Sequence, residues 1–253
     1  MSPLLVEALP GMPEVSPGDD LAALIIAALA RLSSPTAEGD IIAIAHKAVS
    51  KAEGRIRRLS EVTPGPRACA LAAEHGKDPG HVQVVLDESA ALVRADAGRL
   101  ICRTRHGFVC ANAGVDASNA GGADTLVLLP LDPDRSAREL RDALRAELGV
   151  APAVVVTDSF GRPWRIGQSE VAIGCAGLRA LEDWRGRRDG DGRSLSATHV
   201  AIADEVAAAA DLVRGKDSGE PAVRLRGLER HVSADDGLGA SALVRAPEQD
   251  LFG

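Results

Sequence analysis

Short aliphatic runs, each bounded by polar residues, are the feature that most limits how this chain can fold. Residues 40–45 (DIIAIA) are the clearest case, and residues 125–129 and 153–157 repeat the pattern. Runs of this length with polar ends are typical of strands buried inside a sheet. Because only 2% of the 253 residues are aromatic and none is Tyr, the core has to be built from Ala, Val, Leu and Ile. A chain of this length can bury such a core in one large domain or in two small ones.

Helices and further strands are expected around these runs. Asp19 or Asp20 can cap the first helix, Ser136-x-x-Glu139 is a capping box, and Thr198 can cap a later helix. The expected strands are residues 4–9, 100–105, 107–111 and 223–225, and the expected helices are residues 20–32, 64–76, 79–93, 136–149 and 198–213. No repeat or linker divides the chain, so we predict one unit over residues 1–245 and a flexible tail over residues 246–253.

Charge and composition exclude several classes of protein. A formal net charge of −7 argues against general nucleic-acid binding, which needs a basic face. No apolar run approaches the roughly 18 residues of a membrane span, and the N-terminus lacks the pattern of a signal sequence. The four cysteines form no CxxC pair, which indicates reduced, mostly buried thiols rather than a metal site. We expect a soluble cytoplasmic protein with no nucleic-acid or membrane partner.

Residues 107–119 (GFVCANAGVDASN) begin as a strand and end as a turn rich in short polar side chains. A plain core strand does not need this density of Asn, Asp and Ser. Turns of this kind let backbone amides and short carboxylates reach a metal or a phosphate. We expect Asp116 to bind a metal and Asn119 to contact a nucleotide. His106, in the preceding turn, is either a ligand or a structural or solvated histidine.

Two segments in the first fifth of the chain are candidates for ligand binding. His46, Lys47 and Lys51 directly follow the strand at residues 40–45, and the two lysines are half of the four in the chain. Cations just past a buried strand are well positioned for a phosphate, although a surface lysine is normally just solvated. Residues 10–13 (PGMP) form either a simple entry turn or a ligand-binding turn.

The strand at residues 153–157 runs directly into Asp158 and Ser159. An aliphatic strand that ends in Asp is how open sheets present a metal ligand; the alternative is an Asx-turn that stabilises the following loop. Arg162 and Arg165 follow, with forked guanidinium groups that suit carboxylates and phosphates. The sequence has no P-loop, dinucleotide-binding glycine motif or nucleophile elbow, and no covalent nucleophile is expected. The residues alone indicate a metal-dependent enzyme that handles a nucleotide or a phosphate.

Six segments occur in one order along the chain: DIIAIAHKAVSKAEGR, HGFVCANAGVDASN, LLPLDPDRSA, VVVTDSFGRPWRIGQ, the DWRG loop, and AAAADLVRGK before VRLRGL. Together they resemble the coenzyme F420-0:L-glutamate ligase family, the gamma-glutamyl ligases of deazaflavin biosynthesis. The resemblance covers about residues 4–229, and several of its segments exceed ten residues, so it does not arise by chance. Some bacterial relatives carry a further flavin-binding domain after the ligase. This chain is too short for one, so only the ligase activity is implied.

The resemblance implies an amide-forming ligase that converts GTP to GDP. GTP, held with Mg²⁺ or Mn²⁺, would phosphorylate the terminal carboxylate of the phospholactate arm of coenzyme F420-0. The amine of L-glutamate would then attack the acyl phosphate, and further glutamates could join through gamma linkages. Phosphorylation is needed because an unactivated carboxylate is a poor acyl donor, while divalent ions spread the charge of the transferring group. Two divalent ions are expected, and a monovalent cation is a further candidate.

The resemblance also assigns roles to single residues. It gives the metal to Asp116, Asp158 and Ser159. It gives the nucleotide to Pro10, Gly11, Met12, Pro13, His46, Lys47, Lys51, Asn119, Arg214, Gly215, Lys216, Asp217, Ser218, Gly219 and Glu220. Relatives can have an acidic metal ligand at the position of Lys216; a protonated lysine cannot ligate, so Lys216 is expected to contact a phosphate or to indicate a shifted site. Arg162 and Arg165 are expected to bind substrate carboxylates or phosphates, which is an inference from the residues alone.

The fold that the resemblance implies is α+β, with two interlocked subdomains and an intertwined homodimer. The small-molecule partners would be F420-0, L-glutamate and GTP. Two other functions use the same residues. One is a metal-dependent nucleotide phosphohydrolase, which would release phosphate from GTP without either acceptor. The other is a non-enzymatic nucleotide-binding protein of the same fold, which would show no turnover.

Overall fold

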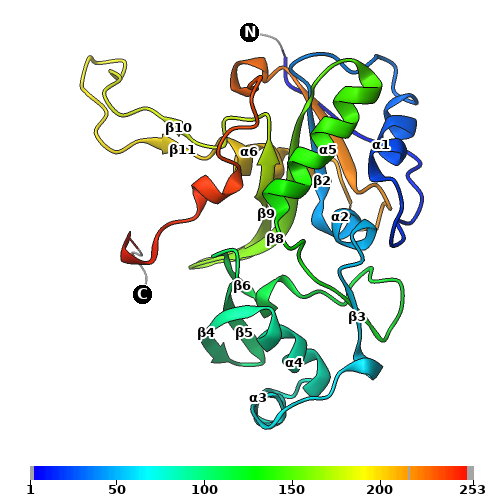
Figure 1. Ribbon diagram of the computed structural model, residues 1–253. Coiled ribbons are helices and arrows are strands. Elements are labelled where there is room, and N and C mark those ends of the chain that lie inside the picture. Colours follow the sequence, from blue (N-terminus) through cyan, green and yellow to red (C-terminus); the bar gives the residue numbers. More distant parts are fainter. Residues whose placement is uncertain (1–2, 216, 250–253) are drawn as a thin grey trace.

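A five-stranded mixed sheet forms the centre of the computed structural model, which describes residues 3–215 and 217–249 (Figure 1). Its strands are β1 (Leu5–Ala8), β2 (Ile41–Ala45), β8 (Ala153–Arg162), β9 (Arg165–Ala176) and β12 (Ala222–Arg226). Their order is β1-β12-β2-β8-β9. Strands β2 and β8 are parallel, and the other neighbouring pairs in this sheet are antiparallel. Strands from opposite ends of the chain, β1 and β12, therefore lie side by side.

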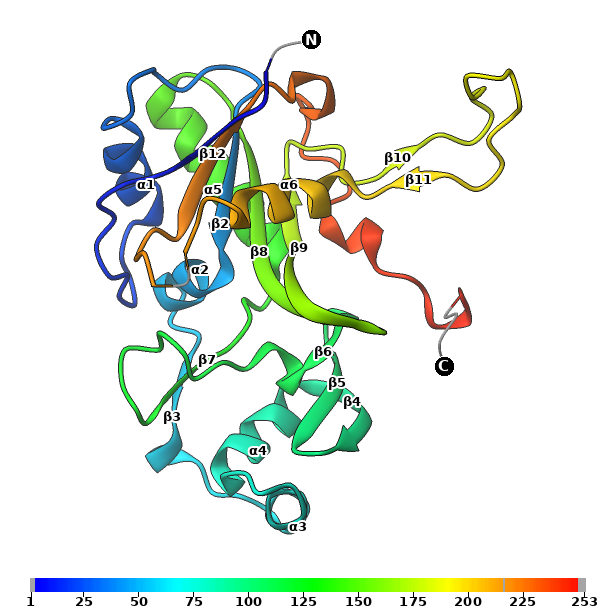
Figure 2. The same cartoon turned by 180° about the vertical axis from the view of Figure 1, so that it is seen from behind.

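Helices cover both faces of this sheet. They are α1 (Leu21–Leu29), α5 (Pro133–Leu148) and α6 (Ile202–Asp211). Figure 1 shows α5 and α1 on one face, and Figure 2 shows α6 on the other. Successive residues of a strand point to opposite faces, so Ile42 and Ile44 of β2 pack in the core beneath α1 and α5, whereas Ile41 and Ala43 pack beneath α6. This is why the run at residues 40–45 is apolar at every position: both of its faces are buried.

A smaller part of the chain, between β2 and β8 in sequence, has its own core. Its elements are β3 (Ile56–Arg58), α3 (Pro66–His75), α4 (Pro79–Asp87), β4 (Ser89–Asp96), β5 (Arg99–Thr104), β6 (Val109–Ala111) and β7 (Thr125–Val127). Strands β4, β5 and β6 form an antiparallel sheet, and β3 pairs with β7. Val82, Leu100 and Leu126 are buried together between these elements. This core lies below the central sheet in Figure 1.

The remaining elements are short. They are α2 (His46–Ala52), β10 (Glu182–Asp183), β11 (His199–Val200) and 3-10 helices at Leu59–Glu61, Asn112–Gly114, Glu229–His231, Ala240–Leu243 and Pro247–Gln249. Strands β10 and β11 form the base of an arm that projects from the body in both views (Figures 1 and 2). The charged residues 183–193 lie on this arm and are mostly exposed, as their composition predicts. Within the described residues, no helix combines the length and the apolarity needed to cross a membrane.

The α+β class predicted from the resemblance is confirmed, as are the strands at both ends of the chain and those expected at residues 100–105 and 107–111, which pair with each other. Gly174 of β9 lets another part of the backbone approach closely. A Cβ on Gly174 would lie 2.2 Å from the carbonyl oxygen of Pro133, so only glycine lets α5 pack this closely against β9.

Three local predictions were wrong, and one helix was not predicted. The helix expected over residues 79–93 ends at Asp87, because the following residues pair with β5 in a ladder that overrides their helix propensity. Helix α5 starts at Pro133 rather than Ser136, and α6 starts at Ile202 without a cap from Thr198. Helix α2 was not predicted: it begins directly at the end of β2 and has no side-chain cap at its start.

Candidate active site

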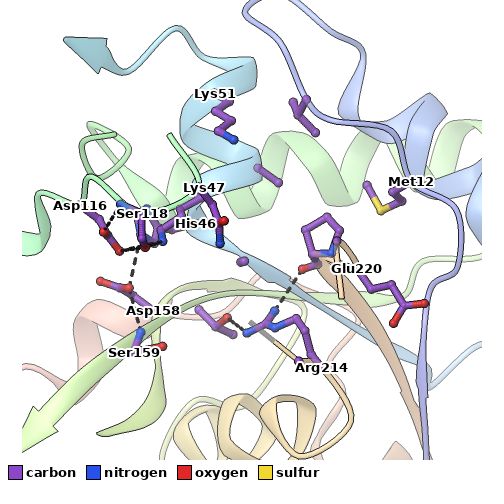
Figure 3. Close-up of a pocket in the computed structure, with 18 of the residues that line it drawn as sticks. Met12, His46, Lys47, Lys51, Asp116, Ser118, Asp158, Ser159, Arg214 and Glu220 are labelled. Atoms are coloured by element: carbon purple, nitrogen blue, oxygen red, sulfur yellow. Dashed lines mark hydrogen bonds and ion pairs between the residues drawn. The ribbon is translucent and has the colours of Figure 1, made fainter. Parts of the chain in front are cut away.

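A cavity of about 690 Å³ opens at the carboxyl end of β2, level with Thr157 of β8. Figure 3 shows side chains from several segments pointing into it. Ligands bind at this kind of position in open α/β sheets, because the loops that leave the strand ends converge there. The lining residues come from residues 12–15, the start of α2, the turn at residues 116–121, the β8–β9 hairpin, the end of α6 and the loop at residues 214–221.

Most of the predicted metal and nucleotide residues line this one cavity. They are Met12, Pro13, His46, Lys47, Lys51, Asp116, Asn119, Asp158, Ser159, Arg214, Gly215, Asp217, Gly219 and Glu220. The structure thus brings together segments that lie up to two hundred residues apart in the sequence.

Other predicted residues lie outside the lining. The carbonyl oxygens of Pro10 and Gly11 accept hydrogen bonds from Arg31 Nη1, at 2.9 and 2.6 Å, so this part of the turn is held by the protein itself. The Ser218 hydroxyl donates to the Gly215 carbonyl oxygen at 2.9 Å, inside its own loop. Arg162 and Arg165 lie at the exposed tip of the β8–β9 hairpin, beyond the cavity. Lys216 lies outside the described residues.

Asp116 is held by two neighbours that keep it charged. Lys47 Nζ lies 2.7 Å from Asp116 Oδ2, and the Ser118 backbone N–H donates to Asp116 Oδ1 at 2.7 Å. Lys47 Nζ also donates to Ser118 Oγ at 2.7 Å. Burial by itself raises the pKa of Asp116, but the hydrogen bonds from Lys47 and Ser118 together outweigh it and lower the pKa below its usual value. Asp116 is therefore ionised at neutral pH, as a carboxyl group that binds a metal ion has to be.

The backbone also fixes the turn that carries Asp116. The backbone N–H of Asp116 donates to the Val127 carbonyl oxygen at 3.0 Å, and Val127 N–H returns a bond of 2.8 Å. This bridge extends the β3–β7 pairing and ties the two ends of the turn together. Within the turn, Asn119 adopts a φ of 53°, a left-handed conformation that Asn tolerates better than most residues. The Asn-rich sequence of this turn thus has a backbone reason as well as a chemical one.

Asp158 lies beside His46 because of the strand register. Ala45 pairs with Thr157 in the parallel β2–β8 ladder. The residues that follow them in the chain, His46 and Asp158, are therefore brought next to each other. His46 Nε2 is 3.3 Å from Asp158 Oδ1, and the His46 side chain is almost fully buried. Asp158 lies inside β8, opposite Val171 of β9, so the alternative of an Asx-turn at Asp158 is wrong. Sequentially adjacent His46 and Lys47 therefore hold the two predicted metal ligands, Asp158 and Asp116.

Three acidic residues in the cavity, Glu14, Glu170 and Asp211, were not singled out from the sequence. Lys51 Nζ forms an ion pair with Glu14, which lies just after the PGMP turn. Glu170 of β9 accepts a hydrogen bond from Ser159 Oγ and forms an ion pair with Arg214. The signal for Glu170 is the register of the hairpin, which places it opposite Ser159. That register depends on the length of the hairpin, which the sequence pattern did not predict.

The donor set suits a hard divalent cation that is shared with a substrate. Among residues 3–215 and 217–249, no group of three or more His, Cys, Asp or Glu side chains is arranged to hold a metal ion. Mg²⁺ is commonly bound by one or two carboxylates, with phosphate and water oxygens completing its shell. Asp116 and Asp158, with the Ser159 hydroxyl beside them, are of this type, and all three lie at one end of the cavity in Figure 3. The residues fit a metal that arrives with a phosphate ligand.

Comparison with known proteins gives a consistent result. The family model described as F420-0:Gamma-glutamyl ligase matches residues 11–227. A relative from Methanopyrus kandleri named Coenzyme F420:L-glutamate ligase is 48% identical over 251 residues, which cover 98% of this chain and 97% of the relative. Proteins of the same name from Methanothermobacter thermautotrophicus and Haloarcula marismortui are 48% and 44% identical, over 96% and 97% of this chain and 96% and 94% of their own lengths.

Proposed function

The chain belongs to the F420-0:gamma-glutamyl ligase family, and from this premise we propose that it joins L-glutamate to coenzyme F420-0 in a reaction driven by GTP and a divalent metal ion. One observation carries the proposal. A single cavity holds two carboxylates at one end and several cations along its walls. A metal-bound nucleoside triphosphate has the complementary charges.

The proposed reaction has two steps. A carboxylate oxygen of the F420-0 arm attacks the γ-phosphorus of GTP, the bond to the β-phosphate oxygen breaks, and GDP leaves. The amine nitrogen of L-glutamate then attacks the acyl carbon, inorganic phosphate leaves with the bonding electrons, and the amine gives up a proton to water. Further glutamates could add in the same way. The protein needs no covalent nucleophile, because its task is to align the reactants and to neutralise charge.

Residues of the cavity divide this task by their chemistry. Lys47 and Lys51 are proposed to hold phosphate oxygens, with Asn119 and the loop at residues 214–221 as further nucleotide contacts. Asp116, Asp158 and Ser159 would hold Mg²⁺ or Mn²⁺, with a second ion and a monovalent cation as further candidates. The bound ion would supply charge neutralisation on the transferring phosphoryl group. Buried His46, whose Nε2 lies 3.3 Å from Asp158 Oδ1, is proposed to help orient Asp158.

The acceptor is proposed to approach along the β8–β9 hairpin. Arg162 and Arg165 lie at the tip of the hairpin that carries Asp158 and Ser159 about halfway along its length. Their positive charges suit the phosphate and carboxylate groups of F420-0. The homodimer and the two interlocked subdomains remain predictions from the resemblance, and a cytoplasmic location remains a prediction from the composition.

A direct assay tests the proposal. The protein is incubated with F420-0, GTP, Mn²⁺ and L-glutamate, and mass spectrometry is used to look for products that differ by one glutamyl residue. We expect these products from the wild type, and none from Asp158→Ala. Asp142→Ala is the matched control, because Asp142 is an exposed aspartate on α5 paired only with Arg145. Both variants should keep the wild-type far-UV circular dichroism spectrum.

The alternative functions predict other outcomes of the same assay. Rapid GTP hydrolysis that needs neither F420-0 nor glutamate would support a nucleotide phosphohydrolase. Nucleotide binding with no turnover under any condition would support a non-enzymatic binding protein. Full ligase activity in Asp158→Ala would remove Asp158 from the metal site.

A further inference from the structure

Glu170 is a buried acid in the middle of the cavity wall. It lies on β9, and its side chain is only 6% exposed. Its Oε1 accepts a hydrogen bond from Ser159 Oγ, and its Oε2 lies 2.8 Å from Arg214 Nη2. Neither the family resemblance nor the composition of the sequence gives Glu170 a role.

Arg214, the partner of Glu170, ties the loop at residues 214–221 to the sheet. Its Nη1 donates to the Pro221 carbonyl oxygen at 3.1 Å, so the guanidinium group at the start of the loop holds the end of the loop. Its Nη2 donates to Thr157 Oγ1 at 3.0 Å. Figure 3 shows Arg214 and Ser159 on the same side of the cavity. Glu170 is the one carboxylate that neutralises this guanidinium group among the described ion pairs.

Stability alone is a poor reason to keep this arrangement. The Arg214 and Glu170 side chains are both less than a tenth exposed, and burying two charges costs desolvation free energy that their attraction scarcely repays. Apolar residues of similar size would fill the same space without that cost. A pair of this kind is best explained by what it does to its neighbours in the site.

Its effect on Ser159 follows from the chemistry of a hydroxyl group. A serine hydroxyl has one proton to donate and two lone pairs to offer. The Ser159 hydroxyl group uses its proton to donate a hydrogen bond to the carboxylate of Glu170. The lone pairs of Ser159 Oγ are therefore left for a cation or for another donor. Glu170 therefore sets which way the hydroxyl group points, although it does not have to touch the substrate itself.

We propose that Glu170 is a positioning residue that links the metal-binding edge of the cavity to the nucleotide-binding loop. One oxygen orients Ser159 beside Asp158, and the other holds Arg214 and, through it, the loop at residues 214–221. The inference rests on the proposed function, because it takes Ser159 as a metal ligand and the loop as a nucleotide contact. Metal and nucleotide binding then depend on one carboxylate, so its loss weakens both.

The test compares Glu170→Gln with a matched variant elsewhere in the same sheet. Glu7 of β1 forms an ion pair with the fully buried Arg224 of β12, and neither residue lines the cavity. The Glu7 side chain is 22% exposed, so Glu7→Gln measures what the loss of a partly buried carboxylate beside a buried arginine does to stability alone. Both variants are compared with the wild type by urea denaturation, by Mn²⁺ titration in the presence of GDP followed by electron paramagnetic resonance, and by ligase kinetics.

We expect Glu170→Gln to weaken Mn²⁺ binding by roughly 10- to 100-fold, the usual effect of removing a group that orients a metal ligand. We also expect a lower kcat and a higher KM for GTP, whereas Glu7→Gln keeps wild-type values for Mn²⁺ binding, kcat and KM and loses only stability. Ser159→Ala should reproduce the Mn²⁺ defect but leave the KM for GTP closer to the wild type. If Glu170→Gln fails to fold, Glu170→Asp replaces it, since the shorter carboxylate cannot reach both partners.

Two outcomes overturn the inference. One is an Mn²⁺ affinity and kcat in Glu170→Gln equal to those of Glu7→Gln, which would make the pair structural. The other is a wild type that binds no Mn²⁺ with GDP. The proposed function fails separately, if the wild type makes no glutamylated product; the Mn²⁺ titrations still compare the variants in that case, because they need no turnover.

Discussion

At the scale of single residues, the cavity is lined by cations that are already paired with anions. Lys47 is paired with Asp116, Lys51 with Glu14, and Arg214 with Glu170, while His46 lies against Asp158. A metal-bound triphosphate brings both signs of charge at once. Phosphate oxygens can replace the carboxylates as partners of the lysines, and the metal can replace the lysines as partner of the carboxylates. These pairs therefore stay compensated in both states, while Asp211, Asp217 and Glu220 add further negative charge to the lining of the cavity.

Thiol chemistry gives a prediction at the same scale. Cys69 is exposed and the other three cysteines are buried. Burial raises the pKa of Cys110 and of Cys175 to about 12, so both stay protonated and unreactive at pH 8. We expect an aromatic disulfide reagent to modify one thiol promptly in the native protein, and Cys69→Ser to abolish that phase. In guanidinium chloride, four thiols should react in the wild type and three in the variant.

The residues of the site differ in how far the sequence could predict them. Asp116, Lys47 and Asp158 were found because the sequence places each in a polar turn or close behind a predicted strand, and such positions converge at a sheet edge, although Asp158 lies inside β8. Glu170 was missed because its importance depends on the β8–β9 register, which brings it opposite Ser159 across the hairpin. Ser118 was missed although it lies in the same turn as Asp116, since only the folded turn shows that its amide and hydroxyl both bind that carboxylate.

At the scale of elements, sequence signals for the start or end of a helix were reliable only where no tertiary contact favoured a different boundary. Gly76 and Gly149 end their helices in the left-handed conformation, as predicted. The Ser136-x-x-Glu139 pattern was a false start signal. Ser136 lies inside α5 and donates to Glu53, whereas the side chain that caps the helix belongs to Asp132, just before Pro133. A proline in the first turn is itself a start signal, and it was the stronger one here.

The cap of α5 can be tested by substitution. Asp132 Oδ1 accepts a hydrogen bond from the backbone N–H of Arg135 at 2.9 Å. Asp132→Ala leaves that N–H without its side-chain acceptor, and we expect it to lower the free energy of unfolding by about 1 kcal/mol. The control is Asp142→Ala in the same helix, which removes an exposed pair and should cost less than about 0.5 kcal/mol. Urea denaturation measures both, and equal losses would show that Asp132 contributes only surface charge.

At the scale of the whole molecule, composition and short runs predicted the α+β class but not how the sheet is assembled. Strand β12 inserts between β1 and β2, so residues near position 225 complete a sheet begun at residue 5. Periodicity describes each strand by itself and carries no information on its neighbours. The same limit explains the C-terminal segment. Residues after 232 have no periodicity, yet Ala240 is fully buried and packs in the core beneath α6.

That segment is held by two buried or partly buried side chains of α5. Asp134 Oδ1 accepts hydrogen bonds from the backbone N–H groups of Cys175 at 2.8 Å and Ala240 at 2.7 Å. Arg141, which is almost fully buried, donates to the Ser233 carbonyl oxygen at 2.9 Å and pairs with Asp236 at 2.7 Å. Residues 233–244 are thus part of the folded body, whereas the tail predicted from the sequence begins only after them.

Two truncations distinguish the body from the predicted tail. A protein that ends at residue 245 should keep its Tm within about 2 °C, because surface changes usually cost little free energy. A protein that ends at residue 232 leaves Arg141 charged, buried and without Asp236. An orphaned buried charge costs roughly 3–5 kcal/mol, so the Tm should fall by roughly 10 °C. Arg141→Met distinguishes the loss of a charge partner from the loss of apolar contacts. The substitution should lower the Tm of the full chain but raise the Tm of the protein that ends at residue 232. If Arg141→Met lowers the Tm of both proteins, residues 233–244 are held mainly by packing around Ala240.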